Sequence, residues 1–202
     1  VEYSLISPGT ELGGYNAPGR ANAYNPGYTA VGTVVGAGPD ADEALLGRRV
    51  FLFPGMEDSK GCHATHKVLK SGGLALVVPV NLDPARACFA RMVNIALTPY
   101  CNAGASIADS VLVVGLGLVG NMIGQVGRIR GFQVIGVDPD PTRRQRALDA
   151  GFDAVVDPGP GEAAAEVKRL TDGKGASLTV NATGCADTFP MSIEATASGG
   201  EI

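Results

Sequence analysis

The sequence lacks several features that would place it in other protein classes. It has no tryptophan, aromatic residues make up 5% of it, and acidic residues outnumber basic ones to give a formal net charge of -4. A protein that neutralises a nucleic-acid backbone or an anionic membrane needs a wide basic face, so we expect neither as a partner. The longest apolar runs, such as residues 111–114, are far shorter than the roughly 20 residues that span a bilayer.

Cysteine is also scarce. Cys62, Cys88, Cys101 and Cys185 form no Cys-x-x-Cys pair, which disfavours both a disulfide scaffold and a compact structural zinc site. We find no signal peptide at the start and no lipidation motif at the end. With 45% hydrophobic residues the chain can form a core, and we expect a soluble, cytoplasmic protein.

The pattern of apolar segments and turn residues divides the chain into two parts. Up to about Pro79, short apolar segments alternate with Gly, Pro and Asn turns, which predicts a small β-barrel or sandwich. The expected strands are residues 30–35, 49–53, 63–69 and 75–80. From Asp83 to about Ala103 the sequence is helix-prone and amphipathic, which predicts a connecting helical segment.

After this segment the pattern alternates between strand and helix. Residues 110–114 are apolar throughout, as in a strand that is buried on both faces of a parallel sheet. The next helix has an apolar face made by residues 119, 122, 123, 126 and 129. Gly124 and Gly127 weaken it by about 1 kcal/mol each relative to alanine, so we expect both to allow close packing against the sheet.

Three more strand and helix pairs follow. Strands are expected at 132–137, 154–156 and 178–181, and helices at 141–150, 162–170 and 188–197. Asp140 is placed to cap the first of these helices, Pro141 to begin it and Gly151 to end it. The predicted fold class is therefore α/β, a doubly wound Rossmann sheet preceded by a β-barrel domain. Because a strand begins at Glu201 and Val1 lies inside another, we expect the chain to be truncated at both ends.

The stretch Gly115-Leu-Gly-Leu-Val-Gly120 matches the dinucleotide pattern G-x-G-x-x-G and lies between a buried strand and an amphipathic helix. Gly115 would permit the tight turn, Gly117 would let the backbone approach a diphosphate, and Gly120 would let helix and strand pack closely. Leu118 and Val119 open the helix, so their amides and the positive end of the helix dipole would face the phosphates. An ordinary turn between strand and helix is the alternative.

Asp138 lies 21 positions after Gly117, at the end of the second strand of the alternating part. A carboxylate there can accept hydrogen bonds from the adenosine ribose, which favours NAD because the 2′-phosphate of NADP would meet a like charge. Arg143 and Arg144 could each reach a 2′-phosphate, so NADP stays the alternative, although a solvated helix face is the simpler interpretation of both arginines.

The carboxyl ends of Rossmann strands face the cofactor. Ala182, Thr183 and Gly184 directly follow the expected strand 178–181. We expect these three residues to line the nicotinamide half of the cleft.

The chain resembles the medium-chain dehydrogenase/reductase superfamily, the relatives of alcohol dehydrogenase and quinone oxidoreductase, over nearly its whole length. The matching stretches are residues 28–38, 47–50, 111–120, 137–138, 150–151, 172–175 and 181–184. The resemblance implies a GroES-like catalytic domain over residues 1–92 and a Rossmann domain over 93–202. It also implies a small-molecule substrate, hydride transfer with NAD(P) and a homodimer or homotetramer.

The resemblance places the catalytic zinc ligands of that superfamily at Ser7, Tyr28 and Asn94, where Cys, His and Cys would stand. Serine, tyrosine and asparagine are poor zinc ligands, and residues 53–61 are too short for the four-cysteine structural lobe. We therefore expect no zinc. A rival metal site at Cys62-His63-x-x-His66 is disfavoured because neighbouring residues of a strand point to opposite faces.

The resemblance also implies three catalytic candidates. Thr10 matches the hydroxyl beside the substrate oxygen, Thr98 matches a residue that contacts the nicotinamide, and Tyr28 could donate a hydrogen bond or a proton to the substrate; for Tyr28, space filling is the alternative. Glu11 is expected to hold its loop. The leading hypothesis is a zinc-independent NAD(H) oxidoreductase acting on a carbonyl, an alcohol or an activated double bond. The alternatives are a zinc-dependent alcohol dehydrogenase-like enzyme and a non-catalytic dinucleotide-binding protein.

Overall fold

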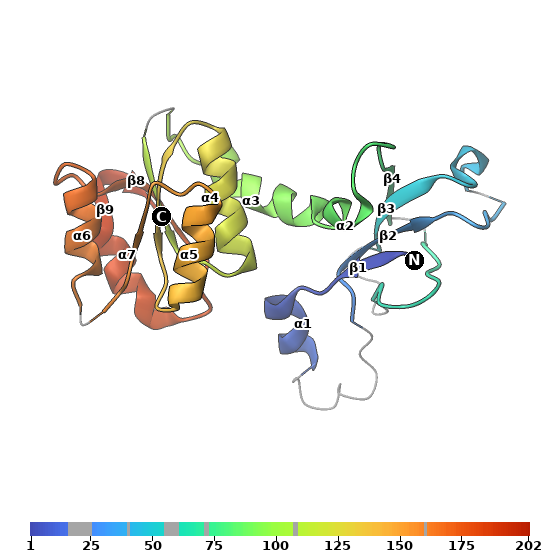
Figure 1. Ribbon diagram of the computed structural model, residues 1–202, viewed down its shortest axis with the longest axis horizontal. Helices are drawn as coiled ribbons and strands as arrows, with labels where there is room; N and C mark the ends of the chain where they lie inside the picture. The colour runs from blue at the N-terminus through green and yellow to red at the C-terminus, as the bar shows by residue number, and fades with distance from the viewer. Residues whose placement is uncertain (16–25, 40, 55–60, 71–72, 107–108, 160) are drawn as a thin grey trace. The chain divides into compact units, whose positions relative to one another are not determined.

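Short runs of apolar residues, buried on both faces, build the sheet of the first part of the chain. The computed structural model describes residues 1–15, 26–39, 41–54, 61–70, 73–106, 109–159 and 161–202, which form two units, Val1–Arg91 and Met92–Ile202 (Figure 1). In the first unit, β1 (Tyr3–Leu5), β2 (Thr29–Thr33), β3 (Arg49–Phe53) and β4 (Leu74–Val77) form an antiparallel sheet in that order. Val31 and Phe51 face each other across β2 and β3 and are buried.

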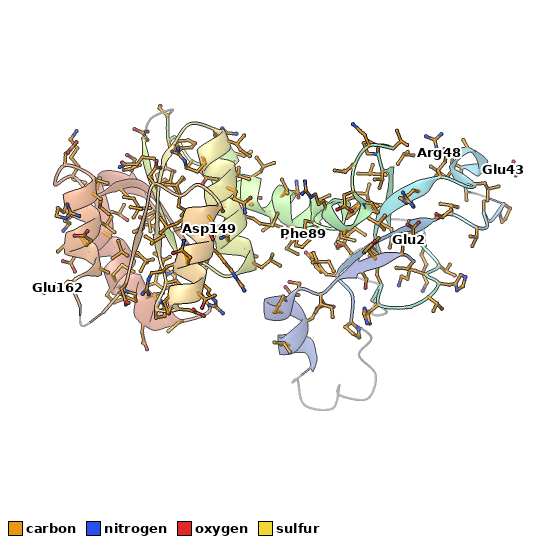
Figure 2. All side chains as sticks on the ribbon, viewed as in Figure 1. Glu2, Glu43, Arg48, Phe89, Asp149 and Glu162 are labelled. Carbon is orange, nitrogen blue, oxygen red and sulfur yellow. The ribbon has the colours of Figure 1, made fainter. Side chains whose placement is uncertain are left out.

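Polar contacts close the ends of this sheet. Glu2, labelled in Figure 2, forms an ion pair of 2.9 Å with Arg49 at the start of β3. The hydrogen bond from Arg49 lowers the pKa of the Glu2 carboxyl. A short 3-10 helix, η1 (Glu43–Leu45), precedes β3 and is capped by Asp42.

The strand predicted at residues 63–69 is wrong. The amide of Ala64 donates to the carbonyl of Cys62, and this tight turn is incompatible with an extended strand. The segment is held by backbone bonds from Cys62 and His63 to the carbonyls of Gly27 and Pro26. Helix α1 (Pro8–Tyr15) and η1 were not predicted, and the strand expected around Val1 is β1, which begins at Tyr3.

The predicted connecting segment consists of two helices, α2 (Pro84–Ala87) and α3 (Ala90–Asn102). Asp83 caps α2 by accepting a hydrogen bond from the amide of Ala85. The division between the two units falls after Arg91, inside the first turn of α3.

The second unit has the predicted parallel sheet, in the order β7-β6-β5-β8-β9. The strands are β5 (Ser110–Val114), β6 (Gln133–Val137), β7 (Ala154–Val156), β8 (Ala176–Asn181) and β9 (Thr196–Glu201). The helices are α4 (Leu118–Ile129), α5 (Pro141–Asp149), α6 (Ala163–Leu170), the 3-10 helix η2 (Ala186–Thr188) and α7 (Phe189–Ala195). Figure 1 shows α4 and α5 on one side of the sheet and α6 and α7 on the other. The α/β fold class is confirmed.

Side chains alternate between these two sides, as expected for a strand buried on both faces. Val111 and Val113 of β5 join the core with Ile123 of α4, whereas Leu112 of the same strand joins the core with Val167 of α6. Among the residues that the structure describes, no helix combines the length and the apolar character needed to cross a membrane.

The close packing predicted for Gly124 and Gly127 is confirmed. A Cβ atom at Gly124 would lie 1.8 Å from the Phe152 ring, and one at Gly127 would lie 2.4 Å from the Tyr100 hydroxyl. Gly127 also lies against the sheet itself, because a Cβ atom there would be 2.9 Å from a methyl carbon of Val134 in β6.

The last predicted helix is too long, because Thr196 and Ala197 belong to β9. Thr196 pairs with Ala176 of β8, and its hydroxyl lies 2.7 Å from that of Thr179. A β-branched residue with a cross-strand partner favours a strand. The final residues therefore continue a strand that begins earlier than predicted.

Candidate nucleotide-binding site

The turn between β5 and α4 has the backbone geometry that its glycines predict. Gly115 has a φ of +89°, in the region that favours glycine, and a Cβ atom at this position would lie 2.6 Å from the methyl carbon of Thr183. A Cβ atom at Gly120 would lie 1.8 Å from the Gly115 carbonyl oxygen. The tight turn and the close packing assigned to Gly115 and Gly120 are thus present in the structure.

Gly117 differs from the other two glycines of the motif. It caps α4 with a φ of -66°, and a Cβ atom there would have no heavy-atom neighbour within 4 Å. The fold itself therefore does not require glycine at this position. Helix geometry gives the amides of Leu118 and Val119 no acceptor within the helix, so they can serve a bound anion.

Asp138 follows β6 and lies beside this turn. Its carboxylate is 2% exposed and accepts hydrogen bonds from the amides of Leu116 and Asp140, each at 2.8 Å. An ionised carboxylate has about four acceptor positions, so these two bonds leave it able to accept from a ribose hydroxyl. The bond to Leu116 was not predicted; it joins the end of β6 directly to the glycine turn.

Arg143 and Arg144, which are neighbours in α5, behave differently. Arg143 is 52% exposed and has one guanidinium nitrogen 3.5 Å from the Asp138 carboxylate. Arg144 is 18% exposed, donates to the carbonyls of Asp138 and Pro139, and pairs with Asp157 at 2.7 Å. The interpretation of both as a solvated helix face is wrong for Arg144, which joins the ends of β6 and β7.

The start of α5 is capped as predicted. Asp140 accepts hydrogen bonds from the amides of Thr142 and Arg143, at 2.7 and 3.4 Å. The bond from the Thr142 amide is the main reason that the pKa of the Asp140 carboxyl is lowered. Pro141 begins the helix, and Gly151 follows its end with a φ of +95°.

Ala182, Thr183 and Gly184 lie on the other side of the glycine turn from Asp138. Strand β8 is the neighbour of β5 opposite to β6, with Asn181 in register with Val114. The amide of Ala182 donates to the Val114 carbonyl at 2.8 Å, and the methyl group of Thr183 covers Gly115. The turn, Asp138 and this loop therefore gather at one end of the parallel sheet, which is where open α/β sheets bind their ligands.

Comparisons with known proteins agree with this arrangement. Residues 119–202 match the family of zinc-binding dehydrogenases. Over 183 residues the chain is 28% identical to the D-guloside 3-dehydrogenase of Escherichia coli (strain K12), a match that covers 89% of this chain. Both matches make the chain similar to dehydrogenases. It spans about half the length of the curated relatives it matches, 50% in the case of the E. coli protein.

Solved structures show the same fold at low sequence identity. Zinc-dependent alcohol dehydrogenase 2 from Streptococcus pneumonia, in its apo form, superimposes with a TM-score of 0.82 at 20% identity, over 98% of this chain and 65% of that one. A mycobacterial protein complexed with NADPH gives a TM-score of 0.75 at 22% identity, over 98% of this chain and 61% of that one.

The catalytic candidates implied by the superfamily lie in both units. In the first, the Ser7 hydroxyl donates to that of Thr10 at 3.3 Å, and the ring of Tyr28 meets the ring of Phe53 edge-on at 5.5 Å. In the second, the Thr98 hydroxyl donates to the Asn94 carbonyl on the exposed side of α3. The substrate roles of Thr10, Tyr28 and Thr98 stay predictions.

Glu11 holds its loop, as predicted. Its buried carboxylate accepts hydrogen bonds from the amides of Ser7 and Gly27, and so joins the start of α1 to the residues before β2. Ser7 and Tyr28, which the resemblance predicts to stand at zinc-ligand positions, lie in or next to the segments joined in this way.

The rival metal motif has a different geometry from the one expected. His63 and His66 are exposed on an irregular segment, and Nδ1 of His63 lies 2.8 Å from the Ser4 hydroxyl. Across the described part of the chain, no three His, Cys, Asp or Glu side chains are grouped so that they could hold a metal ion.

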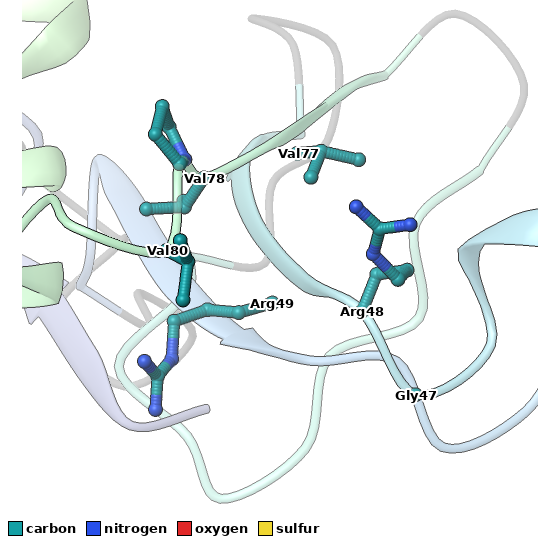
Figure 3. A pocket seen from close by; sticks show the side chains of 7 residues that line it. Gly47, Arg48, Arg49, Val77, Val78 and Val80 are labelled. Carbon is teal, nitrogen blue, oxygen red and sulfur yellow. The ribbon is translucent and has the colours of Figure 1, made fainter.

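Two hollows lie elsewhere. One of about 310 Å³ is lined by Arg48, Arg49 and the apolar residues 77–80 near the end of β4 (Figure 3). The other, of about 390 Å³, lies between the end of α3 and strands β8 and β9. None of the predicted site residues lines either hollow.

Proposed function

We propose that the protein is an NAD(H)-dependent oxidoreductase that transfers a hydride to or from a carbonyl, an alcohol or an activated double bond, without zinc. One observation carries this proposal: at the glycine turn, Gly120 is needed for packing, whereas a side chain at Gly117 would extend only into open space. A glycine without a structural need, at the start of a helix, is explained by a ligand that must approach the backbone.

Different residues around the turn bind different parts of the cofactor. The amides of Leu118 and Val119 would donate to the diphosphate, Asp138 would accept from the adenosine ribose, and Ala182, Thr183 and Gly184 would lie against the nicotinamide. The bound nicotinamide supplies or accepts the hydride. The hydroxyls of Thr10, Tyr28 and Thr98 are the candidates for orienting the substrate and stabilising the charge that develops on its oxygen.

Zinc independence is supported by the donor set at the ligand positions. The Ser7 hydroxyl is used by Thr10 and the Tyr28 ring packs on Phe53, and neither side chain offers the thiolate or imidazole that zinc prefers. We therefore expect that the purified protein contains less than stoichiometric zinc by elemental analysis and that a chelator leaves its turnover unchanged. Stoichiometric zinc whose removal abolishes turnover would favour the zinc-dependent alternative.

The preference for NAD is supported by Asp138, whose charge repels a 2′-phosphate. We expect fluorescence titrations to give tighter binding for NADH than for NADPH and to show weaker NADH binding for Asp138→Ala. Tighter binding of NADPH by the unmodified protein would refute the NAD assignment.

Turnover distinguishes an enzyme from a binding protein. We expect NADH oxidation with at least one member of a panel of aldehydes, quinones and enones. Tight NADH binding without turnover of any member would favour the non-catalytic alternative.

A further inference from the structure

The side chain of Asn181, the last residue of β8, uses all of its hydrogen-bonding capacity. Its Oδ1 accepts from the amide of Thr183 at 3.0 Å and from the Thr183 hydroxyl at 2.6 Å. Its Nδ2 donates to the hydroxyls of Thr188 and Ser192, at 2.8 and 3.2 Å. A side-chain amide has two donors and two acceptor positions, so one residue joins the loop after β8 to helix α7.

Further hydrogen bonds hold the far side of this network. Ser192 is fully buried and donates in turn to the Thr188 carbonyl at 2.9 Å. Thr188 donates to the Cys185 carbonyl at 2.8 Å, and its hydroxyl lies 2.9 Å from that of Thr183. The loop 182–185 is therefore bonded at Cys185 to η2, and Asn181 joins its other end to both η2 and α7.

The near side of the network faces the glycine turn. Thr183, which Asn181 holds by two bonds, covers Gly115 with its methyl group, and Ala182 is bonded to Val114. Asp138 lies on the β6 side of β5, and the loop lies on the β8 side. The order of the strands changes direction at β5, and a dinucleotide lies across the sheet at such a point. A cofactor with its adenosine ribose at Asp138 would therefore have its nicotinamide over the loop.

We infer that Asn181 is a positioning residue for the nicotinamide half of the cofactor: it holds Ala182, Thr183 and Gly184 in the shape that the ring meets. The inference rests on the proposed function. Without the amide of Asn181, the loop would lose its two bonds at Thr183, and cofactor binding would have to order the loop at a cost in affinity.

Thr179 provides a matched control. It lies two residues earlier in β8 and so points to the same face as Asn181, it is fully buried, and its hydroxyl bonds that of Thr196 at 2.7 Å. Thr179→Val removes a hydrogen bond between β8 and the start of β9, directly after α7, but none to the loop.

The experiment measures the affinities of NADH and of ADP-ribose, which lacks the nicotinamide, by calorimetry for the unmodified chain, Asn181→Ala and Thr179→Val. We expect Asn181→Ala to weaken NADH about tenfold, the scale of ordering a few residues on binding, and to leave ADP-ribose within about twofold. Thr179→Val should leave both affinities unchanged. A second variant, Thr183→Val, keeps the packing on Gly115 but loses the hydroxyl, and should weaken NADH in the same selective way.

The results distinguish this inference from the proposed function. Unchanged NADH binding in Asn181→Ala and Thr183→Val, or an equal loss of NADH and ADP-ribose, overturns the positioning role while the proposed function stands. A loss of NADH affinity in Thr179→Val as large as in Asn181→Ala also overturns it, because the effect would then be general to the region. An unmodified chain that binds neither compound overturns the proposed function and the inference together.

Discussion

Two glycines in the turn after β5 serve different purposes, one for folding and the other for binding. A side chain at Gly120 would collide with the carbonyl of Gly115, whereas one at Gly117 would meet nothing in the protein. Gly117 also has a negative φ that any residue can adopt. Folding thus explains the glycine at position 120, and a ligand explains the one at position 117.

Gly117→Ala should therefore change cofactor affinity, and Gly120→Ala should change stability. For Gly117→Ala we expect an unchanged melting temperature but NADH affinity lower by about tenfold, or about 1.4 kcal/mol, because the methyl group occupies the approach to the diphosphate. For Gly120→Ala we expect a loss of about 1–3 kcal/mol of unfolding free energy from overpacking. Denaturant unfolding and NADH titration measure both quantities, and unaltered NADH binding by Gly117→Ala would contradict the proposed site.

Arg143 is an exposed cation next to Asp138, whereas Arg144 donates hydrogen bonds to carbonyls and pairs with Asp157. Arg143→Ala should weaken whatever NADPH binding exists by roughly tenfold, the scale of one charged hydrogen bond, and change NADH binding by less than about twofold. Titrations at low and high salt check this, since the NADPH difference should shrink as salt screens the exposed charge. Equal losses for both cofactors would assign Arg143 to a shared part of the site.

At the scale of helices and strands, sequence patterns predicted the elements that depend on residues close together in the chain. The apolar strand before Gly115 and the apolar face of α4 depend on residues a few positions apart. The strand is present as predicted, and so is the face except at Ile129, which is 86% exposed. Helix α1 was missed because Gly9 and Gly13 lower its intrinsic helix propensity, while the amides of Ser7 and Gly27 meet at Glu11 only after folding. Sequence spacing did not predict the role of Asn181 for the same reason, because its hydrogen-bond partners reach as far as Ser192.

The packing of α4 against the start of β7 offers a test at this scale. Gly124→Ala gains about 1 kcal/mol of helix propensity but places a methyl group inside the Phe152 ring position, so we expect a net loss of about 1–3 kcal/mol. Combining it with Phe152→Leu should recover about 1 kcal/mol relative to the sum of the single variants. Denaturant unfolding of all four proteins gives this coupling, and strict additivity would contradict the contact.

In the whole molecule, every residue assigned to the cofactor belongs to the unit Met92–Ile202, while two of the three catalytic candidates belong to Val1–Arg91. Binding to one unit stabilises that unit by mass action, by about 2.7 kcal/mol at a ligand concentration of 100 times Kd. We therefore expect saturating NADH to slow amide hydrogen exchange in the glycine turn and at residues 182–185, and to leave β2 and β3 unchanged. Protection confined to the first unit would place the cofactor elsewhere.

The distribution of thiols gives a practical route to these measurements. Cys62 and Cys88 are buried and Cys101 and Cys185 are exposed, and burial raises the pKa of the Cys88 thiol, which slows its alkylation further because the thiolate is the reacting form. In a Cys101→Ser background, a maleimide dye would thus attach at Cys185, next to Gly184. Such a reporter would follow the oxidised coenzyme, which has no emission of its own, as readily as the reduced one.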